Sequence, residues 1–324
     1  MRLSRVLPAL LIFTLSSVAI AYKMGFFEPW LKPMIIAAID RGAVTNADEL
    51  AKAIRDEVAK GARVINISVG FAAGSGDLEA AIKEAKAKNV VIVVAAGTGV
   101  TNAFRPDDLA AIYPQAYDDV IVVGAARSFD DTDMLMNHGD ELDVVVLGDF
   151  EASTSTRIAA ATVSTTVAMK LKVNSTDIVR TLVARAYNLE SVRAMLRASS
   201  KAPTLNAGPG FSAVLSRLGF GAFDASAFLD ASVEPLAARV YHNLDGGAQI
   251  ELSSVSAIES LQPTLDCADK TMAEKAIVRA EALKKGRGRV IIERSGSEFS
   301  LKECVAKITA KCVGVADQRI QLSF

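Results

Sequence analysis

Continuous runs of hydrophobic residues predict the strands of a parallel sheet. Residues 64–69 (VINISV) and 90–96 (VVIVVAA) are short, mostly apolar and rich in β-branched side chains. Strands that are covered on both faces show this continuous pattern, whereas strands with one face in water alternate. Mostly apolar runs at residues 34–39, 120–123 and 142–147 predict three further strands.

Amphipathic segments between these strands predict helices that pack on the sheet. Asn46 or Asp48 begins one helix that runs through Lys60, and Asp77 begins a second over residues 77–88. Asparagine and aspartate are favoured helix caps, and apolar residues at helical spacing give each segment one hydrophobic face. Strands that alternate with such helices predict an α/β fold with a doubly wound, mostly parallel sheet.

The segment at residues 155–169 (STRIAAATVSTTVAM) has a different pattern. Small and apolar residues cover nearly every face of it, and Arg157 is its only charge before Lys170. A helix of this kind is buried on most sides, so the rest of the domain is expected to surround it. Further helices are predicted after it at residues 175–186 and 189–198.

Composition narrows the classes of function. The 324 residues are 51% hydrophobic and carry a net charge of -1, so the chain has room for a large core and no bulk attraction to nucleic acid. Its cysteines lie late in the chain: Cys267, Cys304 and Cys312. They lack the paired spacing of a zinc cluster, so no metal site is expected. In an exported protein they allow one disulfide and one free thiol.

The N-terminal segment indicates export. Residues 1–21 combine a basic start, a short apolar run and an Ala-x-Ala ending, which are the parts of a secretory signal peptide. An uncleaved membrane anchor or a buried N-terminal helix fits the same residues. Residues 22–32, with the only tryptophan, are predicted to be a connecting strap or an aromatic collar at a membrane surface. The protein is expected in the cell envelope, the periplasm or the medium, and under the anchor alternative at the membrane.

The composition changes after residue 231 and predicts a separate accessory module of α+β type over residues 232–324. Residues 249–252 and 289–293 alternate and predict strands, and residues 273–285 predict a helix. A basic patch follows that predicted helix: Lys284, Lys285, Arg287 and Arg289. Cations at this position complement the helix dipole, so a structural role is favoured over nucleic-acid binding.

Five motifs together resemble the subtilisin-like serine peptidases, the subtilases. Residues 61–70 (GARVINISVG) are similar to the family's strand that ends in Ser-Leu-Gly, and residues 91–99 (VIVVAAGTG) to its Val-Ala-Ala-Gly-Asn strand. Residues 113–124 (YPQAYDDVIVVG) resemble its Tyr-Pro-Ala segment, residues 156–163 (TRIAAATV) its Thr-Ser-Met-Ala-Ala-Pro-His-Val helix, and residues 219–229 (GFGAFDASAFL) its terminal signature.

The resemblance covers residues 33–231 and implies a subtilisin-like domain that lacks its N-terminal portion. The family's catalytic aspartate and histidine belong to a first strand (Asp-Thr/Ser-Gly) and a helix (His-Gly-Thr-His-Val-Ala-Gly), and neither motif occurs in these 324 residues. The only histidines are His138, in a segment that resembles a surface turn of the family, and His242.

The same register implies what occupies the remaining catalytic positions. Arg157 stands at the position of the nucleophilic serine, and Thr98 at that of the oxyanion-hole asparagine. The resemblance also implies a peptide-binding cleft at the carboxyl ends of the strands. Its two rims are Ser68, Val69 and Gly70 on one side and Ala95, Ala96 and Gly97 on the other.

These positions lead to three hypotheses about function. The first is a catalytically inactive subtilase, a pseudopeptidase without cofactor that binds or scaffolds a peptide or protein partner in the cell envelope. The second is a serine endopeptidase in which Ser155, in a register shifted by two residues, is the nucleophile. The third is a cofactor-binding α/β domain that uses Gly97 to Gly99, although the third glycine of a phosphate-binding loop is missing.

Arg157 leads to a finer prediction. A guanidinium at the start of a helix opposes the helix dipole, so a carboxylate partner is expected, with Asp149 and Glu151 nearest in sequence. Alternatively, Arg157 binds an anionic group of a ligand in bidentate fashion. Loss of the first strand and helix would also leave a sheet edge open, which either residues 22–33 or another chain is expected to cover.

Overall fold

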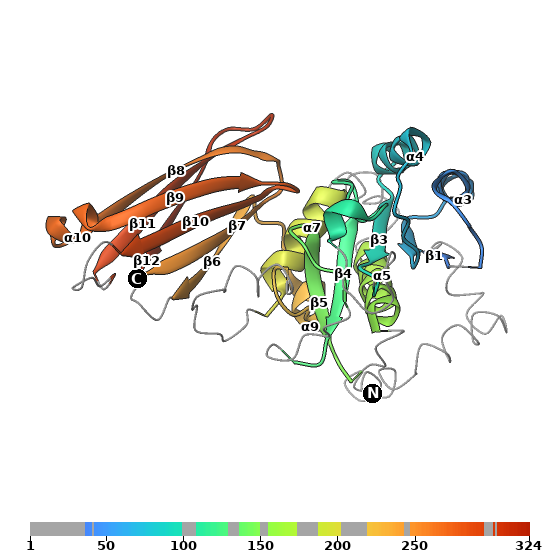
Figure 1. The fold of residues 1–324 in the computed structure, drawn as a ribbon, viewed down its shortest axis with the longest axis horizontal. Coiled ribbons are helices and arrows are strands. Elements are labelled where there is room, and N and C mark those ends of the chain that lie inside the picture. Colours follow the sequence, from blue (N-terminus) through green and yellow to red (C-terminus); the bar gives the residue numbers. More distant parts are fainter. Residues whose placement is uncertain are drawn as a thin grey trace.

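The computed structural model describes residues 36–40, 42–98, 108–128, 136–149, 155–173, 187–201, 219–242, 247–294, 301 and 303–324. They form two parts that lie side by side, a layered α/β domain and a C-terminal module of antiparallel strands (Figure 1). The predictions for residues 1–21, 22–32 and 175–186 lie outside the described residues. Within the described ranges, no helix is long and apolar enough to cross a membrane.

A five-stranded parallel sheet forms the centre of the α/β domain, with the strand order β1-β2-β3-β4-β5. Its strands are Ile36–Ile39 (β1), Val64–Ile67 (β2), Val91–Ala95 (β3), Ile121–Ala126 (β4) and Leu142–Leu147 (β5). Every residue of β2, β3 and β4 is buried, as expected for strands covered on both faces. All five predicted strands are confirmed, with ends that differ by up to three residues.

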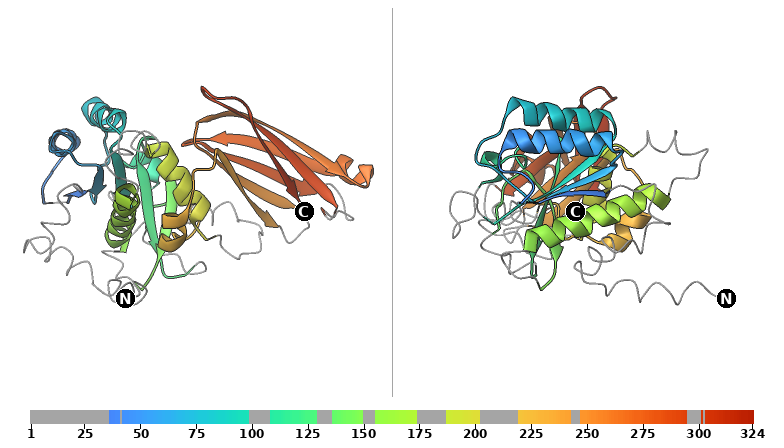
Figure 2. Two further views of the ribbon diagram at one scale, coloured as in Figure 1. Left: turned by 180° about the vertical axis from the view of Figure 1, so that it is seen from behind. Right: turned by 90° about the vertical axis from the view of Figure 1, so that its right-hand side faces the viewer.

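Helices cover both faces of this sheet, which confirms the doubly wound architecture (Figure 2). Ala47–Ala59 (α3) and Gly76–Ala87 (α4) pack on one face. Ser155–Val173 (α5), Leu189–Ser199 (α7) and Ala225–Asp230 (α9) pack on the other. Along α5, only Arg157 and Met169 are exposed among the side chains described, so this helix is buried on most sides as predicted.

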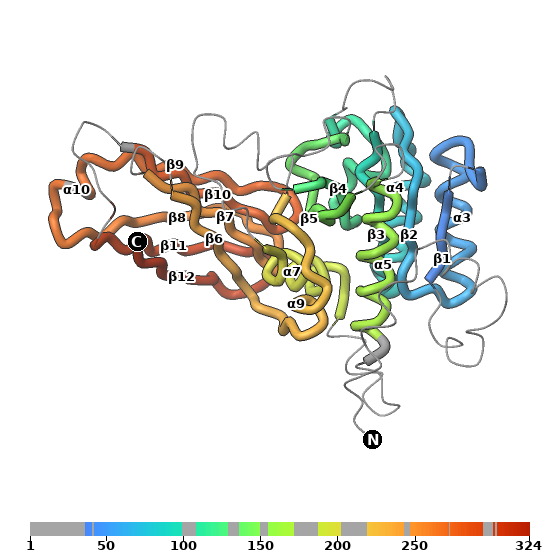
Figure 3. Tube along the Cα trace, turned by 90° about the horizontal axis from the view of Figure 1, so that it is seen from below, coloured from blue at the N-terminus to red at the C-terminus, as the bar shows by residue number. Residues whose placement is uncertain are grey.

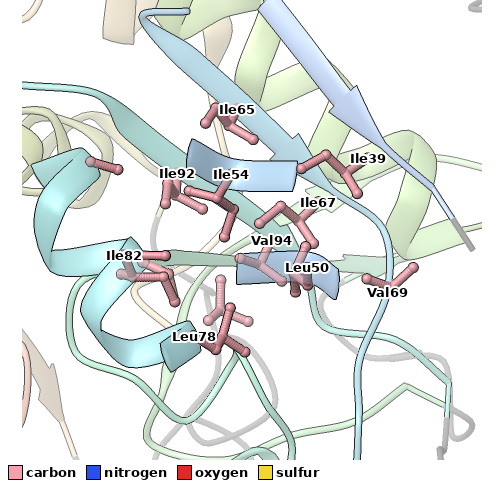
Figure 4. Close-up of a cluster of buried hydrophobic side chains, with 14 of the residues drawn as sticks. Ile39, Leu50, Ile54, Ile65, Ile67, Val69, Leu78, Ile82, Ile92 and Val94 are labelled. Atoms are coloured by element: carbon pink, nitrogen blue, oxygen red, sulfur yellow. The ribbon is translucent and has the colours of Figure 1, made fainter. Parts of the chain in front are cut away.

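Each face of the sheet contributes to its own hydrophobic core. Beneath α3 and α4, Leu50, Ile54, Leu78 and Ile82 pack against the strand residues shown in Figure 4, among them Ile65. A second cluster joins the opposite face to α5, α7 and α9. The apolar faces of α3 and α4 are therefore directed at the sheet, as predicted.

The start of α4 differs from the prediction, because its cap is Ser75 rather than Asp77. The Ser75 hydroxyl accepts a hydrogen bond from the Leu78 amide at 3.1 Å. Asp77 lies in the first turn, where its carboxylate accepts two hydrogen bonds from Arg55 of α3, at 2.8 and 3.0 Å. This side chain therefore links two helices instead of capping one.

Replacing Ser75 with alanine is expected to lower the free energy of unfolding by about 1 kcal/mol, because a first-turn amide loses its acceptor. Asp77→Asn is the control: it keeps the cap and changes an exposed ion pair worth less than about 1 kcal/mol. Chemical denaturation measures both. A larger loss for Asp77→Asn than for Ser75→Ala would contradict this assignment of the cap.

The C-terminal module consists of two antiparallel sheets packed face to face, with the strand orders β6-β7-β10-β9 and β12-β11-β8 (Figure 3). Its strands are Leu236–His242 (β6), Ala248–Ser254 (β7), Ile258–Cys267 (β8), Ala276–Leu283 (β9), Arg287–Arg294 (β10), Cys304–Cys312 (β11) and Gln318–Ser323 (β12). The strands predicted at residues 249–252 and 289–293 are confirmed within β7 and β10.

The helix predicted over residues 273–285 is wrong. A short helix, Lys270–Glu274 (α10), ends where that prediction begins, and most of the remaining residues form β9. The segment contains many helix-forming residues, but β9 pairs along its whole length with β10. A tight turn over residues 284–287 connects the two strands, and its central residues Lys285 and Gly286 both have positive φ, at 57° and 69°, as a type I′ turn requires. Tertiary pairing thus overrides local helix propensity.

The structure contains a disulfide bond, and the cysteine count alone did not indicate which residues form it. Cys267 on β8 and Cys304 on β11 face each other across the sheet and are bonded. Cys312, at the other end of β11, is a buried free thiol. One bridge and one free thiol are the arrangement that the sequence allowed.

Candidate functional site

The two predicted rims of the cleft lie next to each other, because β2 and β3 are neighbours in the sheet and end at the same edge. Ser68, Val69 and Gly70 follow β2, and Ala95 ends β3. Gln115, which is 1% exposed, joins the two rims. Its side-chain amide donates hydrogen bonds to the carbonyl oxygens of Ala95 (2.8 Å) and Val69 (3.3 Å). Gln115 therefore links the two strand ends.

The start of α5 is attached to the second rim. The Gly97 amide donates to the Thr156 hydroxyl at 3.2 Å, and Gly97 has a φ of 83°, a conformation that favours glycine. Asn137, which is fully buried, donates its side-chain amide to the Ala96 carbonyl oxygen at 2.9 Å and its backbone amide to that of Gly97 at 3.0 Å. The rim and the helix start are thus fixed relative to each other.

Sequence reasoning did not identify Gln115 or Asn137 as residues of this site. Both lie in segments that resemble the family, residues 113–124 and the MNHG turn at residues 136–139. Amide side chains in otherwise apolar surroundings are a usable signal, because a buried amide requires hydrogen-bond partners.

Arg157 lies in the first turn of α5, directly after the Thr156 that binds the rim. Its side chain is 51% exposed, and it forms an ion pair with Asp40 at 3.6 Å between Nη2 and Oδ1. The predicted partner Asp149 is wrong, because its carboxylate is fully exposed and 4.0 Å from Arg127. Glu151 lies outside the described residues. Asp40 follows β1, whose carboxyl end reaches the same edge of the sheet, and this explains the contact.

The other candidate residues have these positions. Ser155 begins α5 and is 3% exposed; Thr98 is half-buried beside Gly97. Gly99, the second glycine of the possible phosphate loop, lies outside the described residues, and the Gly97 amide is already bound to Thr156. The chain's two histidines are separated in the fold: the His138 carbonyl accepts from the Leu109 amide, and His242 stands on β6, edge-on to Phe324.

A buried charge cluster joins the α/β domain to the C-terminal module. Asp143 on β5 has no exposed side-chain surface; it accepts from Arg197 of α7 at 2.6 and 3.1 Å and from the Val122 amide at 2.9 Å. Arg193 lies 3.4 Å away and Lys285 of the module 3.9 Å away. Burial by itself raises the pKa of Asp143, but these cations outweigh burial and hold its pKa at about 2.

The predicted basic patch belongs to this junction. Arg287 and Arg289 are buried and bind Glu251 of β7, at 3.5 and 2.6 Å. Arg287 also donates to the Asp140 carbonyl oxygen at 2.6 Å, and its guanidinium lies over the ring of Phe220, 5.8 Å from the centroid. The patch is thus structural, as expected, but it stabilises a domain junction rather than the end of a helix.

Comparisons with known proteins agree with this fold. The model of the subtilase family matches residues 34–221. A thermophilic serine proteinase of Bacillus sp. (strain AK1) is 33% identical over 121 residues, 37% of this chain and 28% of the relative. Subtilisin DY of Bacillus licheniformis is 36% identical over 88 residues, 27% of this chain and 31% of the relative. The chain thus spans less than a third of the length of either relative.

Among solved structures, fervidolysin from Fervidobacterium pennivorans, a keratinolytic enzyme related to subtilisin, aligns over 82% of this chain and 55% of its own, with a TM-score of 0.44 and 14% identity. The family match covers more than half of the chain, including all five strands of the parallel sheet and the helices α3, α4, α5 and α7. The protein belongs to the subtilase family.

Within the described ranges, no group of three or more histidine, cysteine or acidic side chains gathers where it would hold a metal ion.

Proposed function

We propose that this protein is a pseudopeptidase, a subtilase-fold module that binds a peptide or protein partner without hydrolysing it. The observation that supports the proposal is the place of Arg157, which the motif resemblance aligns with the nucleophile, in the first turn of the helix that is attached to Gly97 through Thr156. A guanidinium stays protonated and has no lone pair for attack on a carbonyl. The helix start that holds a nucleophile in subtilases would then hold a cation in this protein.

Arg157 is suited to binding a carboxylate. It is half-exposed, and its contact with Asp40 at 3.6 Å is longer than a charge-assisted hydrogen bond, which leaves donors of the guanidinium available. We propose that a peptide lies along the rims at Val69 and Gly97, with an acidic side chain or its C-terminal carboxylate against Arg157.

A peptide library with free C-termini, and the same library with amidated C-termini and no acidic residues, tests this assignment. Arg157→Ser is expected to weaken binding of the acidic library about tenfold, with no hydrolysis of either library. Arg127→Ser is the matched control, because Arg127 is also exposed but is paired with Asp149, which follows β5, and not with Asp40, which follows β1. Equal binding by Arg157→Ser and the unchanged chain would reject the role of Arg157, and peptide cleavage by the unchanged chain would reject the pseudopeptidase.

The alternative is a serine endopeptidase that uses Ser155, and the relatives' names as proteinases favour it. Ser155 is adjacent to Thr156 at the correct end of α5, but it is 3% exposed, so attack would require an opening movement of the helix start. Labelling by an active-site serine probe distinguishes the two functions.

Export and a partner at the sheet edge complete the proposal. A bridge such as Cys267–Cys304 persists in oxidising compartments, which supports export.

On the β5 side, residues 219–223 cover the sheet edge, with hydrogen bonds between Val145 and both Gly221 and Phe223. No described strand pairs with the outer edge of β1, where we propose that a partner binds. A strictly monomeric protein in gel filtration and crosslinking, alone and with its cell-envelope extract, would contradict a partner there.

A further inference from the structure

Lys285 lies at the tip of the hairpin turn between β9 and β10, and this turn reaches from the C-terminal module into the α/β domain. The turn is closed by the Arg287 amide, which donates to the Lys284 carbonyl oxygen at 3.1 Å. Arg197 of α7 donates to the Lys285 carbonyl oxygen at 2.8 Å. The side chain of Lys284, which precedes Lys285 in the turn, is 58% exposed, whereas the Lys285 side chain has no exposed surface.

The amine of Lys285 has two acceptors at hydrogen-bond distance. It donates to the carbonyl oxygen of Glu141 at 3.0 Å and to that of Val120 at 3.3 Å. A neutral amine has two N–H groups and is satisfied by these two oxygens, whereas an ammonium has three. The Asp143 carboxylate is 3.9 Å from the amine, which is too far for a hydrogen bond.

The carboxylates near Lys285 also interact with other cations, and Arg193 and Arg197 repel an ammonium while Asp143 and Glu141 attract it. The Asp143 carboxylate is shared with Arg197 and Arg193 of α7. The Glu141 carboxylate, just before β5, is 3.8 Å from the Lys284 amine. In the module, the Glu251 carboxylate forms ion pairs with Arg287 and Arg289. Burial is the main cause that lowers the pKa of Lys285 to about 7, against the attraction of Asp143.

We propose that Lys285 makes the docking of the C-terminal module on the α/β domain depend on pH, so that the module is held more tightly in alkaline than in neutral solution. The docked turn accommodates the amine without its extra proton. When the module separates from the domain, the turn enters water and Lys285 takes up that proton.

The direction follows from proton linkage. In water a lysine has its ordinary pKa of about 10.4, so between pH 7 and that value the separated state binds one proton more than the docked state. The docking equilibrium therefore strengthens by about tenfold for each pH unit in this window. Below pH 7 both states are protonated, and the dependence on Lys285 disappears.

Amide hydrogen exchange of the full chain tests the proposal. In the unchanged protein, protection of the β9–β10 turn relative to that of β3 in the same molecule is expected to rise by about tenfold per pH unit from about pH 7 to 9.5, after correction for intrinsic exchange. In Lys285→Met, which has a similar length and no charge, the ratio is expected to be independent of pH. Lys284→Met is the control and should retain the rise.

Two results would overturn the proposal. One is a turn-to-β3 ratio that stays flat over this range in the unchanged protein, a measurement that requires no variant to fold. The other is a rise that Lys285→Met retains in full, which would assign the pH dependence to another group. Lys285→Arg, whose charge is permanent, is expected to show a poorly protected turn at every pH.

Discussion

Replacing Asp143 with asparagine is expected to lower the free energy of unfolding by about 3–5 kcal/mol, the usual cost of removing one partner from a buried ion pair. The change hardly alters volume, but it leaves Arg197 and Arg193 buried opposite a neutral group. It also weakens the contact between β5, α7 and the module, so both parts should unfold at lower denaturant concentration. Urea denaturation followed by circular dichroism measures the loss.

Asp149→Asn is the matched control for this prediction. It removes the same charge near the end of the same strand, but from a fully exposed side chain whose ion pair with Arg127 is 4.0 Å long. Its expected effect is within about 0.5 kcal/mol. If the two variants were equally stable, Asp143 would not hold the junction together.

A second large effect is expected at Gly221, where alanine should cost about 2–5 kcal/mol through backbone strain and overpacking. Gly221 has a φ of 116°, and an added Cβ would clash with the Lys201 carbonyl oxygen. This glycine lies between β5 and residue 201, where its carbonyl oxygen accepts from the Val145 amide at 3.0 Å. A side chain there would push the covering segment away from the edge of β5.

Gly76→Ala serves as the control for Gly221→Ala. Gly76 begins α4, and an added Cβ meets no atom within 4 Å. Because alanine is the better helix former, this variant is expected to be as stable as the unchanged chain or slightly more stable. Thermal unfolding compares the two. A tolerated alanine at Gly221 would contradict the close approach of these backbones.

The α/β domain could be predicted well from the sequence, because its signals are local. The buried strand at residues 142–147 has the predicted bounds, and the amphipathic helix after Asn46 ends within one residue of its prediction. The C-terminal module was harder to predict, because residues 273–285 are rich in helix-forming residues. Their strand conformation depends on pairing with β10, which lies later in the chain. A local pattern contains no information about that pairing.

The candidate site could be predicted only in part, because its residues are held by contacts with residues far away in the sequence. The rims and Arg157 followed from motifs, but the contacts that fix them join residues far apart, such as Gly97 with Thr156. Asp143 lies inside a run that was predicted to be a strand of the sheet, and an acid that is buried there requires a cation. Its partners Arg197 and Lys285 lie in segments that no local pattern connects to it.

Labelling of the folded chain with a fluorophosphonate probe, followed by intact-mass analysis and peptide mapping, tests the pseudopeptidase most directly. Circular dichroism first establishes that the protein is folded, and an active subtilisin treated in parallel establishes that the probe reacts. We expect no mass increase, because the motif resemblance aligns Arg157 with the nucleophile and Ser155 is buried. A stoichiometric increase that maps to Ser155 would contradict the proposal and identify the protein as a serine hydrolase.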